Sequence, residues 1–272
     1  MSDQSNGYFV DTHTHLDHEY PFSIEDYLKH AEDAGVKGFI TIGTTPESIE
    51  GLQKLVKSKS LQNHTVYFSV GIHPHEAKDY SEGVEKKLLA VQEDKACVAI
   101  GEIGLDYHYN HSTQDEQKHA LAQQLNLALH VGKPIVIHSR DAESDLLSQL
   151  TPFAKAFVSK TGREPGVIHC FSGTKEFAEA TLALGFYLSF SGILTFKNAT
   201  ALRDIAKNTP INRVLLETDS PYLAPVPYRG KPNQSSYLIE TAKVLASEKN
   251  ILLPELAKAT TANAKQLFKV EF

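Results

Sequence analysis

Short apolar runs recur along this chain, and many of them end in a histidine or a carboxylate. The clearest cases precede His73, Glu102, His138, His169 and Asp219. The carboxyl ends of parallel strands meet at one edge of a sheet or one end of a barrel, where active sites form. If the runs are parallel strands, these side chains are expected to gather at one place.

The run near the start of the chain carries two such residues. It ends in His13-Thr14-His15, and side chains i and i+2 of a strand point to the same face. Two imidazoles on one face form half of a metal site, so their partners are expected to come from elsewhere in the fold.

The alternation of strands and helices predicts an α/β fold, specifically a single (β/α)8 TIM-type barrel with its active site at the C-terminal ends of the strands. Amphipathic helical stretches separate the strand candidates, and parallel strands require such crossovers. A barrel of this type needs about 250 residues, and the chain has 272. Strands are expected at 8–12, 37–42, 66–71, 96–101, 134–138, 166–169, 186–190 and 213–218.

A doubly wound open sheet is the alternative fold. It is disfavoured because its ligand groups would concentrate at one switch point, whereas here they follow six different strands. No linker or low-complexity segment interrupts residues 1–272, so we expect one domain.

Composition limits the partners and the compartment. The formal net charge of −6 argues against broad adhesion to nucleic acid or to anionic membranes. The first six residues resemble no secretion signal, and no apolar run approaches the ~20 residues of a membrane span. We therefore expect a cytoplasmic protein that binds no membrane, and no obligate protein partner is evident.

The polar residues at the strand ends match a two-metal hydrolase. Four histidines offer nitrogen ligands and two carboxylates offer oxygen ligands, which is more than one four-coordinate ion uses. The expected metal ligands are His13, His15, Glu102, His138, His169 and Asp219. A pair of ions would activate a bound water as the nucleophile, and Asp219 is placed to accept its second proton as general base.

A single histidine at a strand end is more often structural than metal-binding, and His30, His64, His119 and His130 are read that way. The coincidence of such residues at one end of six strands changes the balance, because burying them together without a cation is costly. No P-loop, nucleophile elbow or dinucleotide fingerprint competes with the metal hypothesis.

The strings that contain these residues resemble the TatD family of metal-dependent deoxyribonucleases, within the amidohydrolase superfamily. They occur in that family's order, and the resemblance extends from Phe9 to about Leu267. The strings are His13–Asp17, Gly71–His75, Gly101–Tyr107, Ile137–Arg140, His169–Gly173 and Leu216–Leu223.

The resemblance implies a divalent-metal phosphodiesterase that trims DNA from the 3′ end, with single strands or 3′ ends as the favoured substrate. It also implies that Glu102 bridges the metals and that His73 faces substrate phosphate beside them, so Asp219, Glu102 and His73 are the expected catalytic residues. Imidazole ligands favour zinc, manganese or iron over magnesium, whereas the resemblance implies activity with magnesium. We expect two divalent ions, with magnesium or manganese supporting turnover and zinc bound on isolation.

Further residues are candidates for substrate binding. Arg140, Arg229 and Lys231, together with His73, are expected to hold phosphates, and solvated loop charges are the alternative for the three basic residues. Tyr107, Tyr222 and Tyr228 are candidates for stacking on bases, with packing as the alternative. The family's usual Asn-Glu-Pro after Arg229 and Lys231 is here Asn233-Gln234-Ser235, which predicts a different loop shape.

Two other function classes stay open. One is a superfamily hydrolase of ester, lactone or amide bonds, such as an aminoacyl-tRNA deacylase. The presence of Glu102 on the fourth strand disfavours it, since its binuclear members often place a modified lysine there. The other is a catalytically silent binding protein, which the intact ligand set disfavours.

Overall fold

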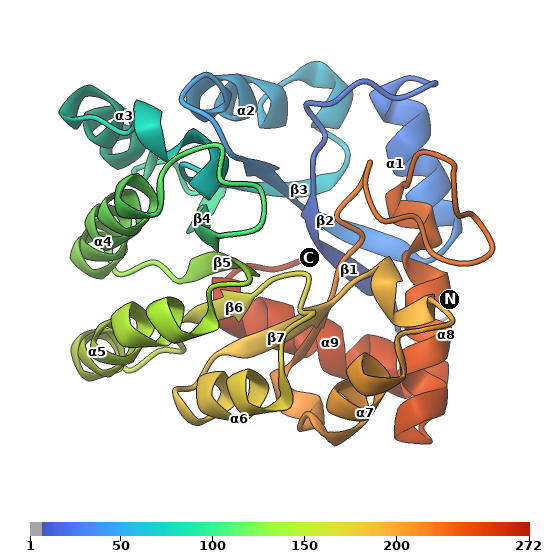
Figure 1. Cartoon of the computed structure of the whole chain (residues 1–272). Helices are drawn as coiled ribbons and strands as arrows, with labels where there is room; N and C mark the ends of the chain where they lie inside the picture. Colours follow the sequence, from blue (N-terminus) through green and yellow to red (C-terminus); the bar gives the residue numbers. More distant parts are fainter. Residues whose placement is uncertain (1–6) are drawn as a thin grey trace.

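The computed structural model describes residues 7–272, and its eight strands form one parallel sheet in the order β1 to β8. The strands expected from the apolar runs therefore form a nearly closed (β/α)8 barrel, as predicted. Figure 1 looks into the barrel, with the helices arranged around the outside. The strands are β1 (Phe9–Thr14), β2 (Val36–Gly43), β3 (Thr65–Val70), β4 (Cys97–Asp106), β5 (Ile135–Arg140), β6 (Gly166–Ile168), β7 (Tyr187–Phe190) and β8 (Val214–Leu216).

Helices follow the strands and cover the outer face of the barrel. The α-helices are α1 (Ile24–Asp33), α2 (Ser48–Val56), α3 (Glu82–Val91), α4 (Gln114–Val131), α5 (Glu143–Thr161), α6 (Lys175–Ala183), α7 (Thr200–Asn208), α8 (Leu238–Lys249) and α9 (Leu253–Phe268). Short 3-10 helices lie at Lys59–Leu61, Pro74–Asp79, Gly192–Thr195, Ile211–Arg213 and Ser235–Tyr237. Among the described residues, no helix combines the length and the apolar character needed to cross a membrane.

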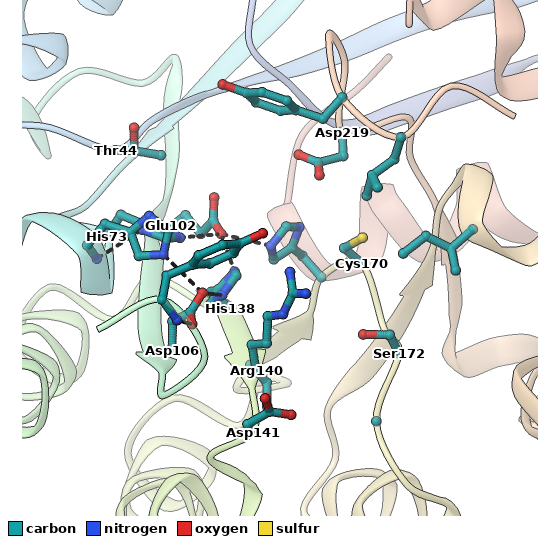
Figure 2. A pocket seen from close by; sticks show the side chains of 18 of the residues that line it. Thr44, His73, Glu102, Asp106, His138, Arg140, Asp141, Cys170, Ser172 and Asp219 are labelled. Carbon is teal, nitrogen blue, oxygen red and sulfur yellow. Dashed lines mark hydrogen bonds and ion pairs between the residues drawn. The ribbon is translucent and has the colours of Figure 1, made fainter. Parts of the chain in front are cut away.

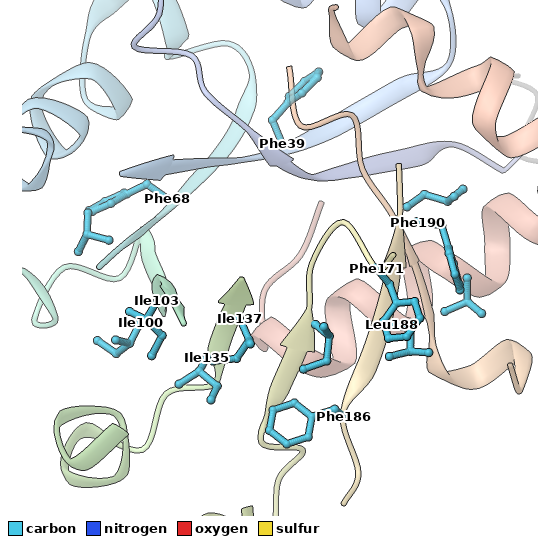
Figure 3. Close-up of a cluster of buried hydrophobic side chains, with 14 of the residues drawn as sticks. Phe39, Phe68, Ile100, Ile103, Ile135, Ile137, Phe171, Phe186, Leu188 and Phe190 are labelled. Atoms are coloured by element: carbon cyan, nitrogen blue, oxygen red, sulfur yellow. The ribbon is translucent and has the colours of Figure 1, made fainter. Parts of the chain in front are cut away.

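Alternation along the strands divides the apolar side chains between two layers. One layer packs the strands against the helices, and Figure 3 shows part of it, with Ile100, Ile135 and Ile137 gathered at β4 and β5. The second layer contains residues such as Val10 and Leu215 and is joined by the end of α9. Because neighbouring strand residues point to opposite faces, this second layer fills the barrel interior.

Strand β4 continues five residues beyond its predicted end at 101. Its register against β5 shifts between Ile100 and Ile103, which marks a bulge around Glu102. Bulges turn a side chain away from the regular alternation and are frequent next to active sites. Gly104 then passes so close to β5 that a Cβ atom would overlap the carbonyl oxygen of His138. Gly104 permits this approach because it has no Cβ atom.

Strand β8 is shorter than predicted and ends at Leu216 instead of residue 218. The backbone turns at Asp219, which has a φ of 57°. The following segment still pairs with β1, because the Asp219 N–H donates to the carbonyl of His13 (2.9 Å) and the His15 N–H donates to that of Ser220 (2.9 Å). These bonds bring the two ends of the sheet together and hold Asp219 beside the histidines.

Candidate metal centre

A cavity of about 1360 Å³ opens at the carboxyl ends of the strands. Residues on or after β1, β3, β4, β5, β6 and β8 contribute to its lining, among them His15, His73, Glu102, His138, His169 and Asp219. Figure 2 shows Glu102, His73 and His138 together, with Asp219 on another side of the cavity. His13 is fully buried but contacts both carboxylates, so all six expected metal ligands lie in this region, together with His73 and Arg140.

The carboxylate of Glu102 is the centre of the arrangement. Its Oε1 lies 2.9 Å from His138 Nδ1, 2.8 Å from His169 Nε2 and 3.3 Å from His73 Nε2. Its Oε2 lies 3.4 Å from His13 Nε2. Burial alone would raise the pKa of Glu102, but the surrounding histidines hold it well below its usual value. Glu102 is therefore an anion surrounded by imidazoles.

Asp219 is the second carboxylate that lies close to histidines, namely His13 on β1 and His15 directly after it. Its Oδ1 lies 3.7 Å from His13 Nε2 and 3.5 Å from His15 Nε2. Burial would raise the pKa of Asp219, yet the hydrogen bond from His15 and the nearby histidines lower it. The two histidines predicted to share one face thus converge on a carboxylate that is about 200 residues distant in sequence.

The donor atoms fit divalent metal ions. Within the described residues, three sets around the two carboxylates have ligand atoms within 4.8 Å of one another: His13 with His15 and Asp219, His13 with Glu102 and His169, and His73 with Glu102 and His138. A fourth set, His15 with Asp17 and His18, lies at the edge. His73, expected to face substrate phosphate, is here grouped with potential metal ligands.

His13 provides an independent test of this fit. Neither of its ring nitrogens has a hydrogen-bond partner among residues 7–272, although both are buried. Its ring stacks on that of His169, with the centroids 4.0 Å apart. Burial and the neighbouring His169 lower the pKa of His13, which leaves a neutral imidazole with an unused lone pair. Such a buried, unpartnered nitrogen is costly in a protein interior unless it binds a cation.

The charge of the cavity gives a second test. Six carboxylates line it, those of Glu76, Glu102, Asp106, Asp141, Glu143 and Asp219, whereas Arg140 is the one lysine or arginine that residues 7–272 contribute to the lining. An anionic substrate would be repelled from such a cavity without bound cations. Divalent ions would reverse this balance at the point where the ligands converge.

Outer carboxylates orient two of the histidines. His138 directs Nδ1 at Glu102 and donates from Nε2 to Asp106 Oδ2 (3.1 Å). The Nδ1 of His169 lies 3.3 Å from Glu217 Oε1, and the backbone N–H of Cys170 donates to the same oxygen (2.5 Å). Metal-binding histidines commonly use their second nitrogen in this way. Asp106 and Glu217 were not among the residues expected at the site, although their positions near strand ends could have suggested a role.

Behind the candidate metal ligands lies a buried hydrogen-bond network that the sequence did not reveal. Asp11 Oδ2 accepts from the hydroxyls of Thr218 (2.6 Å) and Ser235 (2.6 Å), and its Oδ1 accepts from the Thr218 N–H (3.0 Å). Burial raises the pKa of Asp11 to about 7, although hydrogen bonds from Ser235 and Thr218 oppose the shift. The network connects β1 with the segment after β8, and it thereby supports both His13 and Asp219.

The expected phosphate-binding residues occupy different positions. Arg140 lines the cavity, and its guanidinium carbon lies 4.9 Å from the centre of the Tyr109 ring. Arg229 and Lys231 do not line it. Arg229 instead packs 4.0 Å over Phe196, which is a lining residue, so it is located at the rim.

The three tyrosines predicted to meet bases also separate. Tyr222 lines the cavity. Tyr107 donates its hydroxyl to Asp145 on α5 (2.7 Å), and Tyr228 stacks on Tyr237 with the ring centres 3.8 Å apart. Neither of these two lines the cavity, whereas Tyr109, which was not among the expected residues, does.

Comparison with known proteins identifies close relatives of this arrangement. Residues 10–269 match the family described as TatD related DNase. The chain is 38% identical over 268 residues to the uncharacterised metal-dependent hydrolase YcfH of Escherichia coli K12, covering 97% of each chain. It is 32% identical over 254 residues to the 3′-5′ ssDNA/RNA exonuclease TatD of the same organism, covering 91% of this chain and 94% of the relative.

A solved structure has the same fold over nearly its whole length. The crystal structure of YjjV, a TatD homologue from Escherichia coli K12, superposes with a TM-score of 0.87 at 30% identity, covering 97% of this chain and 98% of that one.

Proposed function

Because this chain belongs to the family of TatD-related deoxyribonucleases, we propose that it is a divalent-metal-dependent nuclease that removes nucleotides from the 3′ ends of single-stranded DNA. The observation that supports this most strongly is the Glu102 carboxylate, within 3.4 Å of nitrogens from four histidines. We propose that residues 1–272 form a single domain and that this domain carries the activity.

Six residues would hold two divalent ions, with magnesium or manganese supporting turnover: His13, His15, Glu102, His138, His169 and Asp219. The proximity of His73 to Glu102 makes it a seventh candidate. When bound, such ions supply a water that is deprotonated near neutral pH and polarise the phosphate under attack. Glu102 is suited to bridge them, because its two oxygens face different histidines.

Asp219 is the proposed general base. Its carboxylate is ionised, since nearby histidines lower its pKa, and an ionised carboxylate at the cavity wall can accept a proton from water. The turn at Asp219 holds it against β1 through the hydrogen bond to the His13 carbonyl. The general base and two proposed metal ligands are thus positioned by the same junction.

The shape and charge of the cavity favour chain ends. It is a pocket at the barrel mouth with one basic lining residue, Arg140. A protein that binds along a nucleic-acid backbone needs a groove lined with positive charge. The described residues give this cavity only one lysine or arginine, so it does not form such a groove. A substrate that inserts one end needs few phosphate contacts, and Arg140 can provide one of them. A relative 32% identical is a 3′-5′ exonuclease on single-stranded DNA and RNA, which supports the direction.

The test is degradation of a 5′-labelled single-stranded DNA oligonucleotide with magnesium and then with manganese. The wild type is expected to produce a ladder that shortens from the 3′ end. Asp219→Asn removes the proton acceptor while preserving side-chain size, and is expected to lower the rate at least a hundredfold. Blocking the 3′ terminus with a nuclease-resistant linkage is expected to stop the wild type as well.

Two outcomes would contradict the proposal. Cleavage at internal positions of a 3′-blocked oligonucleotide would exclude the exonuclease assignment. Intact DNA with every metal, from protein that binds the metal stoichiometrically, would exclude the nuclease assignment and direct attention to ester, lactone and amide substrates.

A further inference from the structure

Two exposed tyrosines stand at the cavity. Tyr109 is 53% exposed and Tyr222 is 52% exposed, and both line it. The other strongly exposed large hydrophobic side chains in residues 7–272 are aliphatic: Leu89, Val158, Ile211, Val226 and Leu252. Both strongly exposed aromatic side chains of the described residues therefore lie at the cavity.

We propose that Tyr109 and Tyr222 are stacking platforms for unpaired bases on opposite sides of the metal-ligand residues. This inference rests on the proposed function and identifies side chains that would select single strands. Base stacking on an aromatic ring accepts any base, because every base has a π-face. Base stacking would add affinity for the substrate beyond the phosphate contact that Arg140 can provide.

The loop after β4 holds Tyr109 in place. Asp106 Oδ1 accepts the backbone N–H groups of His108 and Tyr109, both at 3.0 Å. The ring of His111 is nearly parallel to that of Tyr109, with the centres 5.9 Å apart and the planes 18° apart. The Arg140 guanidinium lies over the ring, with its central carbon 4.9 Å from the ring centre, which places a phosphate-binding group next to the stacking surface. One nucleotide could use both groups.

Tyr222 is fixed by its backbone. Its N–H donates to the carbonyl of Asp219 (2.8 Å), and its own carbonyl accepts from the side chain of buried Asn233 (2.7 Å). The Tyr222 ring lies 6.0 Å from that of His15 and 5.7 Å from that of His18, in edge contacts. These contacts place the ring next to a proposed metal ligand while leaving half of the residue exposed.

The hydroxyls of Tyr109 and Tyr222 make no hydrogen bond within the described residues, whereas those of Tyr107 and Tyr20 do. What Tyr109 and Tyr222 offer at the cavity is thus mainly ring surface. In an eight-stranded barrel β4 and β8 are opposite each other, so the two rings flank the ligands between them. Figure 2 shows the same separation for Arg140 and Asp219, which lie on different sides of the cavity.

The test compares two oligonucleotides of equal length, one normal and one with abasic nucleotides at its four 3′-terminal positions. For Tyr109→Ala and Tyr222→Ala, kcat/KM on the normal oligonucleotide is expected to fall about tenfold, mainly through KM. On the abasic oligonucleotide the same variants are expected to differ from the wild type less than twofold. Tyr109→Phe and Tyr222→Phe keep the ring and are expected to retain wild-type kinetics. Leu252→Ala, which removes an exposed side chain that does not line the cavity, is the matched control.

Equal losses on both oligonucleotides would overturn the proposal, because the tyrosines would then act without bases. A Phe variant as impaired as its Ala counterpart would also overturn it. If the wild type cleaves neither oligonucleotide, the proposed nuclease function fails by itself. Fluorescence anisotropy of the labelled normal and abasic oligonucleotides then measures whether the rings recognise bases. Equal affinity of the protein for both oligonucleotides, or no binding of either, would refute the inference.

Discussion

Asp106 accepts four hydrogen bonds with its two carboxylate oxygens. His75 and His138 donate to Oδ2 at 3.0 and 3.1 Å, and two backbone N–H groups of the following loop donate to Oδ1. Burial alone would raise its pKa, but the hydrogen bonds from His138, the Tyr109 amide and His75 hold the pKa well below its usual value. One side chain therefore orients both a proposed metal ligand and the loop that carries Tyr109.

Asp106→Asn is expected to weaken metal binding by about 10- to 100-fold, the usual effect of losing a carboxylate behind a ligating histidine. The measurement is competition with a chromophoric chelator, which reports affinity independently of turnover. Asp145→Asn is the control, since that carboxylate accepts from Tyr107 on the outer side of the loop. Unchanged affinity in Asp106→Asn, with only the folding stability reduced, would restrict Asp106 to a structural role.

Ser235 occupies a position where the family pattern has proline, and the structure uses groups that proline lacks. Its hydroxyl donates to Asp11 (2.6 Å) and its N–H donates to the Tyr27 hydroxyl (2.9 Å). Ser235→Ala leaves a buried carboxylate with one donor fewer, and we expect a loss of about 1–3 kcal/mol in the free energy of unfolding. Urea denaturation measures it.

Ser235→Pro is expected to cost more than Ser235→Ala, because it also removes the N–H donated to Tyr27. Ser148→Ala, which removes an exposed hydroxyl on α5, is the control and is expected to stay within about 0.5 kcal/mol of the wild type. A Ser235→Ala effect no larger than that of the control would mean that water replaces the lost donor.

At the scale of elements, strand β4 illustrates how irregularity serves the site. Ten consecutive residues of this strand are buried, and a regular strand of that length would alternate strictly between its two faces. The register shift between Ile100 and Ile103 interrupts the alternation at Glu102. The carboxylate is thereby held by a strand instead of a loop, and nitrogens of four histidines lie within 3.4 Å of it.

The end of α8 depends on a half-buried lysine and provides a pH-dependent test of its packing. Lys249 Nζ donates to the carbonyls of Thr209 (2.5 Å) and Lys207 (3.2 Å) at the end of α7. Burial lowers the pKa of Lys249 from 10.5 to about 8. Between these values the unfolded chain binds more protons than the folded one, so the stability contributed at this position rises with pH.

The free energy of unfolding of the wild type minus that of Lys249→Met is therefore expected to increase from pH 7.5 to pH 10. Urea unfolding at several pH values measures this difference. Lys243→Met, which removes an exposed lysine from the same helix, controls for the loss of a surface charge. A difference that stays constant over the range would show that the Lys249 ammonium is as well solvated in the folded protein as in the unfolded one.

At the scale of the whole molecule, the sequence predicts what depends on local periodicity. The eight strands and the positions of His13, His15, His138 and His169 follow from apolar runs and their ends. The bulge at Glu102, the Asp11 network and the separation of Tyr107 from Tyr109 depend on contacts between segments distant in sequence. Arg229 illustrates the same limit, since only the fold reveals that its partner is Phe196 and that it lies outside the cavity.

Removing divalent metal is expected to destabilise the whole barrel, because the proposed ligands come from strands around its circumference. Without cations, the carboxylates and the unpartnered His13 remain buried together. An ion at 100 times its Kd adds about 2.7 kcal/mol, and a domain of this size gains about 2–4 °C per kcal/mol. Adding manganese to chelator-treated protein is therefore expected to raise Tm by about 5–10 °C in scanning calorimetry. Glu102→Gln removes the carboxylate shared by two of the ligand sets, and its Tm is expected to change by less than half as much. An equal shift in wild type and variant would place the bound ion elsewhere on the molecule.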